Sequence, residues 1–405
     1  MNILVLNAGS ASLKFDVIAT LNNDALPSQQ CKVASGMIEG IGERPKFSLL
    51  RNKEIIYQRD LEGSGYAEAT RYVFDWLSQN PKQSNVAKNE LDAVTHRVVH
   101  GGDRFTSPVL IDAEVIAGIE ALEELAPLHN APALDCIDAA REIVGNDTAM
   151  VAVFDTVFHR TIPQHAALYG LPWELSRRHK IRRYGFHGIS HEYLARRYGQ
   201  ITNRPFEEVT VVTFHLESGC SACAVLKGQS IDTSMGFTPL EGLMMGMRSG
   251  DLDPSIVGYL IRKEHVDEKK VEDWLNNEAG LLGVSGKSHD TRVLMQLIDK
   301  NQRALLALEI FCYRIRKCLG SYLAALGGAQ AIIFGGGIGE DTPFVRERVL
   351  EDLEWLGLRF DAESNQQTIN REGRITTADS SMSAYVIPVE EGLMMAHQTV
   401  ECLNK

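Results

Sequence analysis

Short apolar runs separated by small polar turns dominate the start of the chain. Ile3 to Leu6 and Phe15 to Ile18 are apolar, and Asn7 to Lys14 lies between them. This pattern predicts a strand, a tight turn and a second strand. The turn offers backbone N–H groups, hydroxyls and one lysine without bulky side chains, which suits a polyanion such as a nucleotide phosphate. It is not a Walker loop, because no Gly-Lys-Ser/Thr ends it, and a plain serine-rich turn is the alternative.

A similar pattern recurs in the second half of the chain. Val209 to Phe214 is a strand-like run that breaks at His215–Ser221 and resumes from Ala222 to Leu226. One such turn in each half indicates a duplicated domain that faces its copy across a cleft. Chance similarity between two short segments is the competing interpretation.

The other periodic segments predict a mixed α/β chain. An amphipathic helix is expected over residues 300–326, and no low-complexity linker interrupts the chain. Further strands are expected at Leu91–Gly102 (ending in a glycine turn), Ala149–Phe154, Ala331–Phe334 and Tyr385–Pro388, and further helices at Glu114–Leu125 and Glu391–Leu403.

Composition narrows the class of protein. The 405 residues predict two domains, or three, and 44% apolar content supports ordinary buried cores. A net charge of −12 argues against a general nucleic-acid binder, so any anion site must be a local basic pocket. An early strand leaves no room for a signal peptide, no apolar run approaches the roughly 20 residues that span a bilayer, and seven scattered cysteines favour reduced thiols. We therefore expect a cytoplasmic protein with no membrane or nucleic-acid partner.

Several other clusters favour plain structural roles. Cys220 and Cys223 form a C-x-x-C in a strand-like run, where residues three apart face opposite sides, so a metal or redox role is disfavoured. The methionines of segment 232–254 are expected to fill a core. A solvated face is expected for the basic cluster Arg177, Arg178, Lys180, Arg182 and Arg183.

Two residues at strand ends are candidates for chemistry. Arg97 precedes His100-Gly-Gly and could grip a small carboxylate through two hydrogen bonds. Carbonyls or an internal carboxylate could equally satisfy it. Asp155 ends a strand and could bind Mg²⁺ through water, orient an arginine or cap a helix.

Glycine-rich segments supply the remaining candidates. His187 lies between Gly185 and Gly188, which leaves its imidazole open to a ligand. The segment 232–254 holds four glycines, four acids and a single cation, Arg248, and is expected to be a functional loop. Gly335 to Gly339 follows a strand and lets the backbone approach a nucleotide closely.

Together these motifs resemble the acetate kinases and their short-chain acyl kinase relatives, end to end. The 232–254 match is the most specific. The matching motifs are N-x-G-S-x-S-x-K at 7–14, H-R-V-V-H-G-G at 96–102, F-D-T-x-F-H at 154–159, Y-G-F-H-G-x-S-H at 184–191, D-T-S-M-G-F-T-P-L-E-G-L-M-M-G at 232–246, R-S-G-D-L-D-P at 248–254 and G-G-I-G-E at 336–340.

The resemblance implies the α/β fold of the actin, Hsp70 and sugar kinase superfamily, with duplicated ribonuclease-H-like domains around a central cleft. Residues 1–155 with 385–405 would form the domain that holds acyl group and metal. Residues 156–384 would form the nucleotide domain. The resemblance also implies a homodimer.

The resemblance further implies a set of site residues. Asp155 would be the catalytic acid, and His187 and Arg248 would stabilise the transition state. Asn7 and Glu391 would hold Mg²⁺, for which Mn²⁺ could substitute. Arg97 would hold the acyl carboxylate near His129, and its alkyl tail would meet Val99, Leu128, Phe186 and Pro239. ATP or ADP would bind Lys14, His215, Leu216, Glu217, Ser218, Gly219, Asp290, Thr291, Arg292, Gly336, Gly337, Ile338, Gly339 and Glu340.

These roles agree with the chemistry of phosphoryl transfer. The transition state spreads negative charge over three oxygens, so positioned cations and Mg²⁺ are needed. A carboxylate acceptor is already ionised at neutral pH, because carboxylic acids have pKa values of about 4. We therefore expect Asp155 to position Arg97 or a Mg²⁺-bound water rather than to accept a proton.

The chain departs from the family pattern at four positions. Glu217 and Ser218 stand where the family's second phosphate turn, H-L-G-N-G, has glycine and asparagine; Met247 replaces a threonine, and Gly392 replaces a second glutamate. A carboxylate 4 Å from a phosphate oxygen could cost about 4 kcal/mol at a surface-like dielectric. A glycine position can also require positive φ, which glutamate tolerates poorly.

Three functions remain open at this stage. The first is an acetate kinase that reversibly transfers the γ-phosphoryl group of ATP to acetate, giving acetyl phosphate and ADP. The second is a weakened or altered-donor short-chain acyl kinase, similar to propionate kinases. The third is a non-catalytic ligand-binding or regulatory protein on the same fold.

Overall fold

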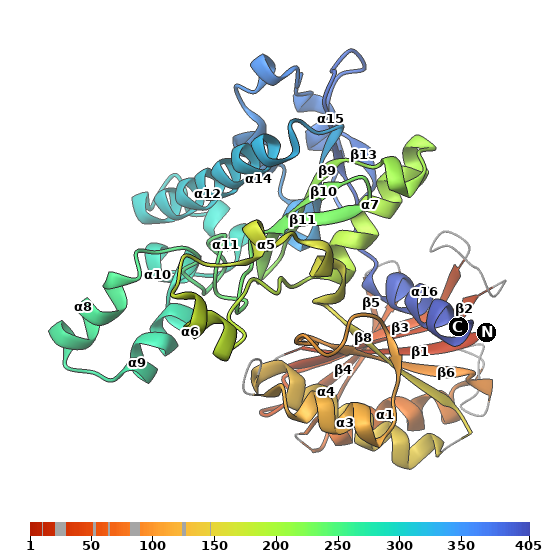
Figure 1. Cartoon of the computed structure of the whole chain (residues 1–405). Coiled ribbons are helices and arrows are strands. Elements are labelled where there is room, and N and C mark those ends of the chain that lie inside the picture. Colours follow the sequence, from red (N-terminus) through yellow and green to blue (C-terminus); the bar gives the residue numbers. More distant parts are fainter. Residues whose placement is uncertain are drawn as a thin grey trace. The chain divides into compact units, whose positions relative to one another are not determined.

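Two compact units make up the computed structural model, which describes residues 1–9, 11–20, 30–51, 54–63, 65–81, 90–123, 127–145 and 147–405; the side chains of residues 30 and 127–129 lie outside this description. Unit 1 comprises Met1–Val157 and Glu390–Lys405, and unit 2 comprises Phe158–Val389. Each unit is built on its own mixed sheet, with helices packed against it (Figure 1).

Unit 1 contains an eight-stranded sheet in the order β5-β4-β3-β2-β1-β6-β8-β7. The central strand β1 pairs antiparallel with β2 and parallel with β6, which in turn pairs parallel with β8. The strands are β1 (Asn2–Ala8), β2 (Ser12–Thr20), β3 (Gln30–Glu39), β4 (Lys46–Arg51), β5 (Glu54–Asp60), β6 (Ala93–Val98), β7 (Val109–Leu110) and β8 (Ala149–Phe154).

Both faces of this sheet are covered by helices. Alternate residues of a strand face opposite sides, and Leu4 and Leu6 of β1 belong to the main hydrophobic core with α1 (Tyr66–Gln79) and α4 (Pro127–Val144). Ile3 and Val5 face the other side, which the C-terminal helix α16 (Glu391–Leu403) covers (Figure 1). The short helix α3 (Ala113–Glu120) begins where the Asp112 side chain accepts a hydrogen bond from Val115 N.

Unit 2 repeats this strand order. Its sheet runs β11-β10-β9-β12-β14-β13, with β9 antiparallel to β10 and parallel to β12, and β12 parallel to β14. β11-β10-β9-β12-β14 therefore has the order and directions of β3-β2-β1-β6-β8, and the predicted duplication is confirmed. The strands are β9 (Val211–Leu216), β10 (Cys220–Leu226), β11 (Gln229–Thr233), β12 (Ala331–Gly335), β13 (Gly373–Arg374) and β14 (Ser383–Val386).

Helices lie on both sides of the unit 2 sheet. Figure 1 shows α7 on one side and α12 with α14 on the other. The helices are α5 (Gln164–Ala167), α6 (Trp173–Arg178), α7 (Gly188–Thr202), α8 (Ser255–Glu264), α9 (Glu268–Asp273), α10 (Gly280–Ser285), α11 (Thr291–Met295), α12 (Gln302–Leu326), α13 (Gly336–Asp341), α14 (Pro343–Leu350) and α15 (Ala362–Gln367).

The predicted elements are present, with shifted ends. The predicted helix Glu114–Leu125 is shorter in the structure, because α3 ends at Glu120 and residues 124–126 lie outside the described part. The last predicted strand, Tyr385–Pro388, corresponds to β14, which pairs with β12 in the sheet of unit 2. Within the described residues, no helix has the length and apolar character needed to cross a membrane.

Candidate functional site

Four predicted site residues of unit 1 meet at one edge of its sheet. Asn7 lies near the carboxyl end of β1, Arg97 near that of β6, and Asp155 directly follows β8, while Glu391 is the first residue of α16. Parallel strands bring their carboxyl ends to the same edge, so the topology itself gathers these side chains. We call them the unit 1 cluster.

Hydrogen bonds join the unit 1 cluster into one chain. Arg97 donates from Nε to Asp155 Oδ1 at 3.0 Å and from Nη2 to Asp155 Oδ2 at 2.5 Å, and its Nη1 donates to Asn7 Oδ1 at 3.0 Å. Asn7 Nδ2 donates to Glu391 Oε2 at 2.8 Å. Asp155 is 0% exposed, so its carboxylate depends on the arginine for charge compensation. Of the three roles left open for Asp155, these contacts favour orientation of an arginine.

A second set of charges anchors the start of α16 beside this cluster. Lys32 Nζ on β3 lies 2.6 Å from Glu390 Oε2 and 3.3 Å from Asp16 Oδ1 on β2. Burial lowers the pKa of Lys32, but the two carboxylates outweigh it and leave the pKa raised. Lys32 is therefore a charged anchor for the residue that precedes Glu391.

The missing side chain at Gly392 has a structural counterpart. A Cβ at this position would lie 2.1 Å from Asp16 Oδ2. Asp16 therefore fills the space into which a side chain at 392 would extend, and it supplies a carboxylate from β2 where the family pattern has one on the helix.

The unit 1 cluster has the chemistry of a magnesium site. Mg²⁺ prefers hard oxygen ligands and is usually held by one or two carboxylates, with waters and substrate phosphates completing its shell. The Asn7 amide oxygen and the Glu391 carboxylate meet that description. No group of three or more His, Cys, Asp or Glu side chains that could hold a metal ion occurs in the described ranges.

In unit 2, the predicted phosphate turn joins β9 to β10 and packs against two glycine segments. Gly246 N donates to Ser218 O at 3.3 Å, and a Cβ at Gly336 would lie 2.7 Å from Leu216 O. Gly336 has φ of +76°, which only glycine adopts readily. The turn, the 232–254 loop and the Gly336–Glu340 segment are thus in contact within unit 2.

The carboxylate of Glu217 is engaged by a histidine. Its Oε2 lies 3.6 Å from His215 Nε2, and its side chain is 47% exposed. His215 Nδ1 is buried without a hydrogen-bond partner in the described structure. Glu217 is not among the described non-glycine residues with positive φ, so the expectation of backbone strain at this former glycine position is wrong. An extra side chain fits because position 217 has ordinary backbone geometry.

His187 and Arg248 complete what we call the unit 2 cluster, together with the His215–Gly219 turn and Gly336. His187 caps α7 in the left-handed region with φ of 56°, a conformation that costs free energy and is common at functional sites. Its ring centroid lies 4.5 Å from that of His215. A Cβ at Gly219 would lie 3.5 Å from His187 Cε1 and 3.9 Å from Arg248 Nη1. Both side chains therefore border the His215–Gly219 turn.

Burial changes the electrostatics of Arg248. Desolvation lowers its pKa, and Nη1 donates to the carbonyl of Pro239 at 3.4 Å. Arginine remains charged even with such a shift. The unit 2 cluster therefore holds a partly desolvated cation, whose attraction for an anion is stronger than in water.

The other nucleotide residues of the prediction have their own local roles. Glu340 Oε1 accepts hydrogen bonds from Gly336 N at 3.0 Å and Val389 N at 2.9 Å, which fixes the start of α13. Asp290 caps α11 and pairs with Arg292 at 2.7 Å, and this hydrogen bond lowers the pKa of Asp290. Lys14 is exposed on β2, directly across the hairpin from Asn7.

The predicted acyl-pocket residues are divided between the units. Val99 and Phe186 are buried, and Pro239 is half-buried. The side chains of Leu128 and His129 lie outside the described residues. Cys220 and Cys223 are buried, and burial raises the pKa of both thiols, as expected for packing residues.

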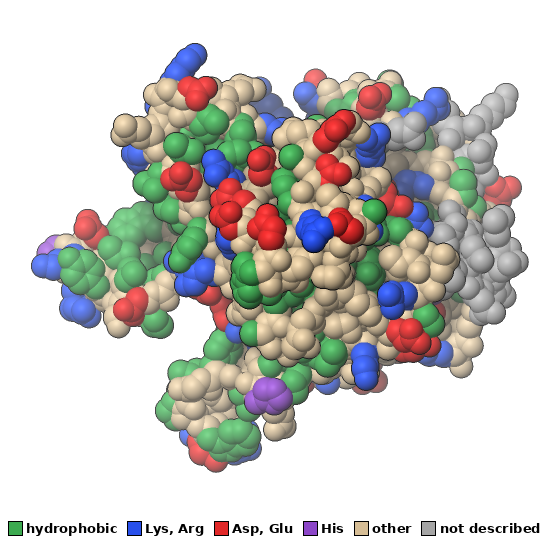
Figure 2. Space-filling model, turned by 90° about the horizontal axis from the view of Figure 1, so that it is seen from above, with side chains coloured by type: hydrophobic (Ala, Val, Ile, Leu, Met, Phe, Trp, Pro, Cys, Tyr) green, Lys and Arg blue, Asp and Glu red, His purple; other side chains and the backbone are tan. Residues whose placement is uncertain are grey.

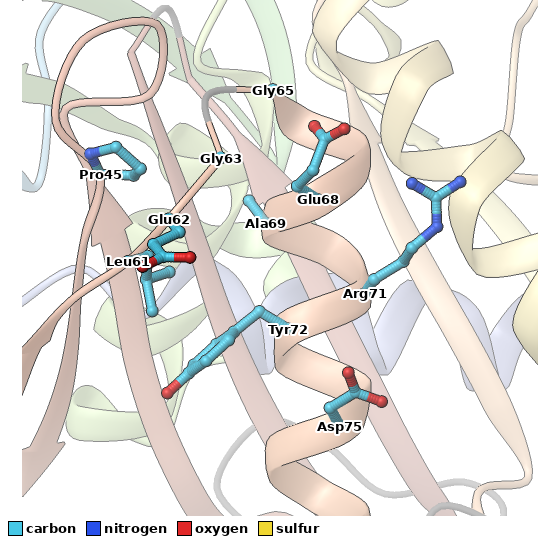
Figure 3. Close-up of a pocket in the computed structure, with 10 residues that line it drawn as sticks. All are labelled: Pro45, Leu61, Glu62, Gly63, Gly65, Glu68, Ala69, Arg71, Tyr72 and Asp75. Carbon is cyan, nitrogen blue, oxygen red and sulfur yellow. The ribbon is translucent and has the colours of Figure 1, made fainter.

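A cavity of about 220 Å³ lies elsewhere in unit 1, between α1 and the loop before it (Figure 3). Glu62, Glu68 and Asp75 line it with Tyr72 and Arg71, whose Nη2 pairs with Glu142. None of the predicted site residues lines this cavity, and its acidic lining does not suit a phosphate.

Two groups of supporting side chains are not predicted from the sequence. Asp16, Lys32 and Glu390 hold the start of α16, and Ser221 lies 2.8 Å from His187 Nδ1. Lys14 and Asp16 are two residues apart on a predicted strand and therefore lie on one face of it. This spacing could have identified Asp16 as a residue near the site. No sequence signal identified Lys32, because its partners are distant along the chain.

Comparison with known proteins agrees with this geometry. The profile of the acetokinase family matches residues 2–397. Acetate kinase of Solibacter usitatus is 45% identical over 414 aligned positions, covering 100% of this chain and 98% of the relative, and acetate kinase of Caldanaerobacter subterraneus is 46% identical with 98% coverage of each.

Solved structures agree as well. Acetate kinase of Porphyromonas gingivalis superposes with a TM-score of 0.90 at 35% identity and 99% coverage of both chains. A propionate kinase of Francisella tularensis superposes with a TM-score of 0.88 at 37% identity and 98% coverage of both. The fold, the strand-end residues and these matches along the whole length lead to one conclusion: the chain belongs to the acetokinase family.

Proposed function

We propose that this protein is an acetate kinase, which transfers the γ-phosphoryl group of ATP to acetate and forms acetyl phosphate and ADP. The observation that supports this most strongly is the unit 1 cluster. It presents an arginine, held by a buried carboxylate, beside the two oxygen donors Asn7 and Glu391. A protein that only binds a carboxylate needs one cation. This chain also has His187 and Arg248 beside the turn that is proposed to bind phosphate.

Arg97 is proposed to bind the acetate carboxylate. The planar guanidinium suits the two oxygens of a carboxylate, and the hydrogen bonds that it donates to Asp155 and Asn7 fix its plane. Acetate is ionised at neutral pH, so the nucleophile needs no general base. Asp155 is then a positioning residue for Arg97 rather than a proton acceptor.

Asn7 and Glu391 are proposed to hold Mg²⁺, with Mn²⁺ as a substitute. When bound, the ion neutralises charge on the phosphates of the donor and on the transferring group. In the described structure Arg97 and Glu391 both bond to the Asn7 side chain. A change at Asn7 should therefore alter both metal affinity and the arginine that binds the acceptor.

The unit 2 cluster is proposed to bind the donor and the transferring phosphoryl group. Arg248 and His187 donate hydrogen bonds to oxygens whose negative charge grows in the transition state. The His215–Gly219 turn, Asp290–Arg292 and Gly336–Glu340 bind the nucleotide together with Lys14. Each of these assignments predicts a rise in KM for ATP, or a fall in kcat, on substitution.

The alkyl group of the acceptor is proposed to contact Val99, Leu128, Phe186 and Pro239, with His129 nearby. One methylene changes binding by about 1–3 kcal/mol in an apolar pocket, so acetate and propionate should differ by roughly that amount in transition-state binding. The ratio of kcat/KM values for the two acids measures this preference directly.

A homodimer is proposed for the assembled enzyme. Large apolar side chains are exposed on unit 2, among them Trp173 on α6, Tyr259 on α8 and Tyr313 on α12. Figure 2 shows hydrophobic side chains gathered on the projecting α8–α9 segment. Exposed apolar surface of this kind favours association, and light scattering should give twice the chain mass of 44.9 kDa.

A cytoplasmic location is also proposed. Each of the seven cysteines is described, and each is a free thiol. Free thiols of this number favour a reducing compartment.

A second candidate, an acyl kinase with weak ATP affinity or another phosphate donor, rests on Glu217. Its carboxylate stands in the turn proposed to bind the donor phosphates and lies against His215. Because it is half-exposed, water screens its charge, and its repulsion of a phosphate is weaker than that of a buried charge at the same distance. We therefore favour ATP as donor with reduced affinity.

Trapping of the acyl phosphate with hydroxylamine tests the proposal. The purified protein is incubated with acetate and Mg²⁺, and with ATP, other nucleoside triphosphates or inorganic pyrophosphate as donor. Hydroxamate formed with ATP supports acetate kinase, and hydroxamate formed only with another donor supports the second candidate. If no donor gives product, both are wrong and a binding role remains.

A further inference from the structure

A buried chain of hydrogen bonds leads from the core of unit 2 to His187. His187 Nδ1 lies 2.8 Å from Ser221 Oγ, Ser221 Oγ lies 2.8 Å from His191 Nε2, and His191 Nδ1 lies 2.8 Å from Thr213 Oγ1. Ser221, His191 and Thr213 are all 0% exposed. Water therefore cannot replace any of these partners without rearrangement of the core.

Regular secondary structure places these four side chains in register. His187 and His191 are four residues apart at the start of α7, which puts them on one face of the helix. Ser221 on β10 is paired with His215 on β9, and Thr213 is two residues before His215, so all three face the same side of the sheet. That side is the one against which α7 packs, because His191 reaches Thr213 and Ser221 there.

The number of available protons limits which group donates in each of these hydrogen bonds. Burial, with a smaller contribution from neighbouring histidines, lowers the pKa of His191 well below its usual value, so its ring is neutral and carries one N–H. Each hydroxyl also has one proton to donate. The donors in this row of hydrogen bonds can therefore point in only two directions, and reversing one bond reverses all of them.

The direction restricts the protonation of His187. When Ser221 donates, Nδ1 carries no proton and the neutral ring has its N–H on Nε2. When Ser221 accepts, Nδ1 carries a proton, in an imidazolium or in a neutral Nδ1–H ring.

In the first direction, Thr213 donates to His191, His191 donates to Ser221, and Ser221 donates to Nδ1 of His187. A neutral His187 ring then carries its proton on Nε2. If His187 is an imidazolium, its Nδ1–H donates to Ser221, which donates to His191 Nε2, and His191 Nδ1–H donates to Thr213. Ser221 can serve as donor in the first case and as acceptor in the second.

We propose that Ser221, supported by His191 and Thr213, is a positioning residue that keeps an N–H on Nε2 of His187 in both charge states. This inference rests on the proposed role of His187 as a hydrogen-bond donor to the transferring phosphoryl group. Its consequence is that turnover through His187 does not depend on the ionisation of that ring.

Charged and titratable side chains of unit 2 lie around this row of hydrogen bonds. His215 packs against His187, Arg248 Nη1 and His187 both lie near Gly219, and Glu217 Oε2 lies 3.6 Å from His215 Nε2. His159 packs against His191 with ring centroids 5.8 Å apart, and burial lowers its pKa to about 4.

Thr213 Oγ1 is 0% exposed and, among the described residues, bonds only to His191. Its proton is satisfied only when Thr213 donates, and in that direction Ser221 donates to His187 and a neutral His187 ring has its N–H on Nε2.

Ser221→Ala removes the central link, and Ser230→Ala is its matched control. Ser230 Oγ lies 2.8 Å from Nδ1 of His159, a buried histidine that packs against His191 but is not part of the chain. Both variants lose one buried hydroxyl from a histidine partner. Only Ser221→Ala should disturb His187.

The first readout is the pH dependence of turnover between pH 5.5 and 8.5. We expect kcat of Ser221→Ala to fall at least tenfold at pH 7.5, with KM for ATP changed less than twofold, and to decrease further as pH rises. Wild type and Ser230→Ala should share a flat profile over this range. A Ser221→Ala profile parallel to that of Ser230→Ala would overturn the proposal.

The second readout needs no activity and so separates this proposal from the proposed function. Ring ¹⁵N chemical shifts of selectively labelled protein report which nitrogen of His187 carries the proton. We expect one Nε2–H tautomer in wild type and a mixture in Ser221→Ala. If Ser221→Ala does not fold, Thr213→Val should give the same mixture to a smaller degree. An unchanged His187 signal in the folded variant contradicts the inference.

Discussion

The two units share a topology, but their equivalent turns differ in charge. The β1–β2 turn contains Gly9, whose N–H bonds to Ser12 O at 2.8 Å, and its strand-end partners Asn7 and Lys14 face each other across the hairpin. The β9–β10 turn contains an acid, Glu217, whose N–H bonds to Gly219 O at 3.1 Å. In unit 1 the acids come from elsewhere, from the end of β8 and the start of α16.

This difference shows what topology determines and what single residues determine. Parallel strands bring polar residues to one sheet edge in both units. The unit 1 cluster then consists of acids bound to an arginine and an amide, whereas the unit 2 cluster consists of histidines, glycines and one arginine. The two clusters occupy equivalent positions in the two units but carry different charges. They are therefore suited to different ligands.

The largest expected effect is the loss of the arginine in unit 1. In Arg97→Gln, the buried Asp155 loses its counter-charge, which should lower the free energy of unfolding by about 3–5 kcal/mol. Loss of the cation should also reduce kcat/KM for acetate on the order of 10²–10³-fold. Hydroxamate assays and urea unfolding measure the two effects.

Arg104→Gln is the matched control, because Arg104 pairs with Glu114 on the surface of the same unit. It should change stability by no more than about 0.5 kcal/mol. If Arg97→Gln behaves like this control, the unit 1 cluster is not the organised charge pair described above.

Acid should destabilise both units through buried histidines. Burial lowers the pKa of His96 in unit 1 to about 3 and, as the main cause, that of His159 in unit 2 to about 4. Native histidines stay neutral, whereas unfolded ones bind protons below about pH 6.5, so unfolding takes up protons and is favoured as pH falls. At pH 5 each histidine should cost about 2 kcal/mol of stability relative to pH 7.5.

Replacement by leucine separates the two histidines. Neither ring nitrogen of His96 has a hydrogen-bond partner in the described structure, whereas His159 lies within 3.0 Å of Phe186 O and 2.8 Å of Ser230 Oγ. His96→Leu should therefore stabilise the protein at pH 5, and His159→Leu should destabilise it at pH 7.5. Equal slopes of stability against pH in wild type and His96→Leu would rule out the unit 1 part of this explanation.

A smaller effect is expected at the start of α16. Gly392→Glu places a side chain against Asp16 Oδ2, and overpacking of this kind costs about 1–3 kcal/mol. Adding Asp16→Ala removes both the clash and the like charge, so the double variant should recover most of the lost stability. Thermal unfolding and Mg²⁺ titration of the three variants test this; additive losses in the double variant would show that the two positions do not share the space.

Much of this arrangement is predictable from the sequence for physical reasons. Short apolar runs broken by small polar turns predict the hairpins, and two similar turns indicate the duplication, because strand pattern and turn chemistry are local properties. Arg97 and Asp155 were recognised as residues at strand ends. Their mutual pairing was one of several alternatives, since it depends on β6 and β8 being neighbours in the sheet.

The contacts that the sequence did not predict join distant segments. Lys32 and Glu390 are 358 positions apart, and no local pattern pairs them. The approach of Glu217 to His215 depends on side-chain directions at the end of β9, which the spacing of two residues does not determine. The sequence indicates only that Ser221 ends the turn, because it does not show which face of α7 packs against β10.

The smallest expected effect, at Glu217, is also the most direct test of the contrast between the two turns. If the β9–β10 turn binds donor phosphates and its acid opposes them, Glu217→Gly and Glu217→Gln should both lower the Kd for MgATP, by about threefold to tenfold, equivalent to about 1 kcal/mol. The gain should shrink at high salt, because exposed charges are screened. Calorimetric titration of wild type and both variants at two salt concentrations gives this answer. An unchanged Kd in both variants would contradict the account.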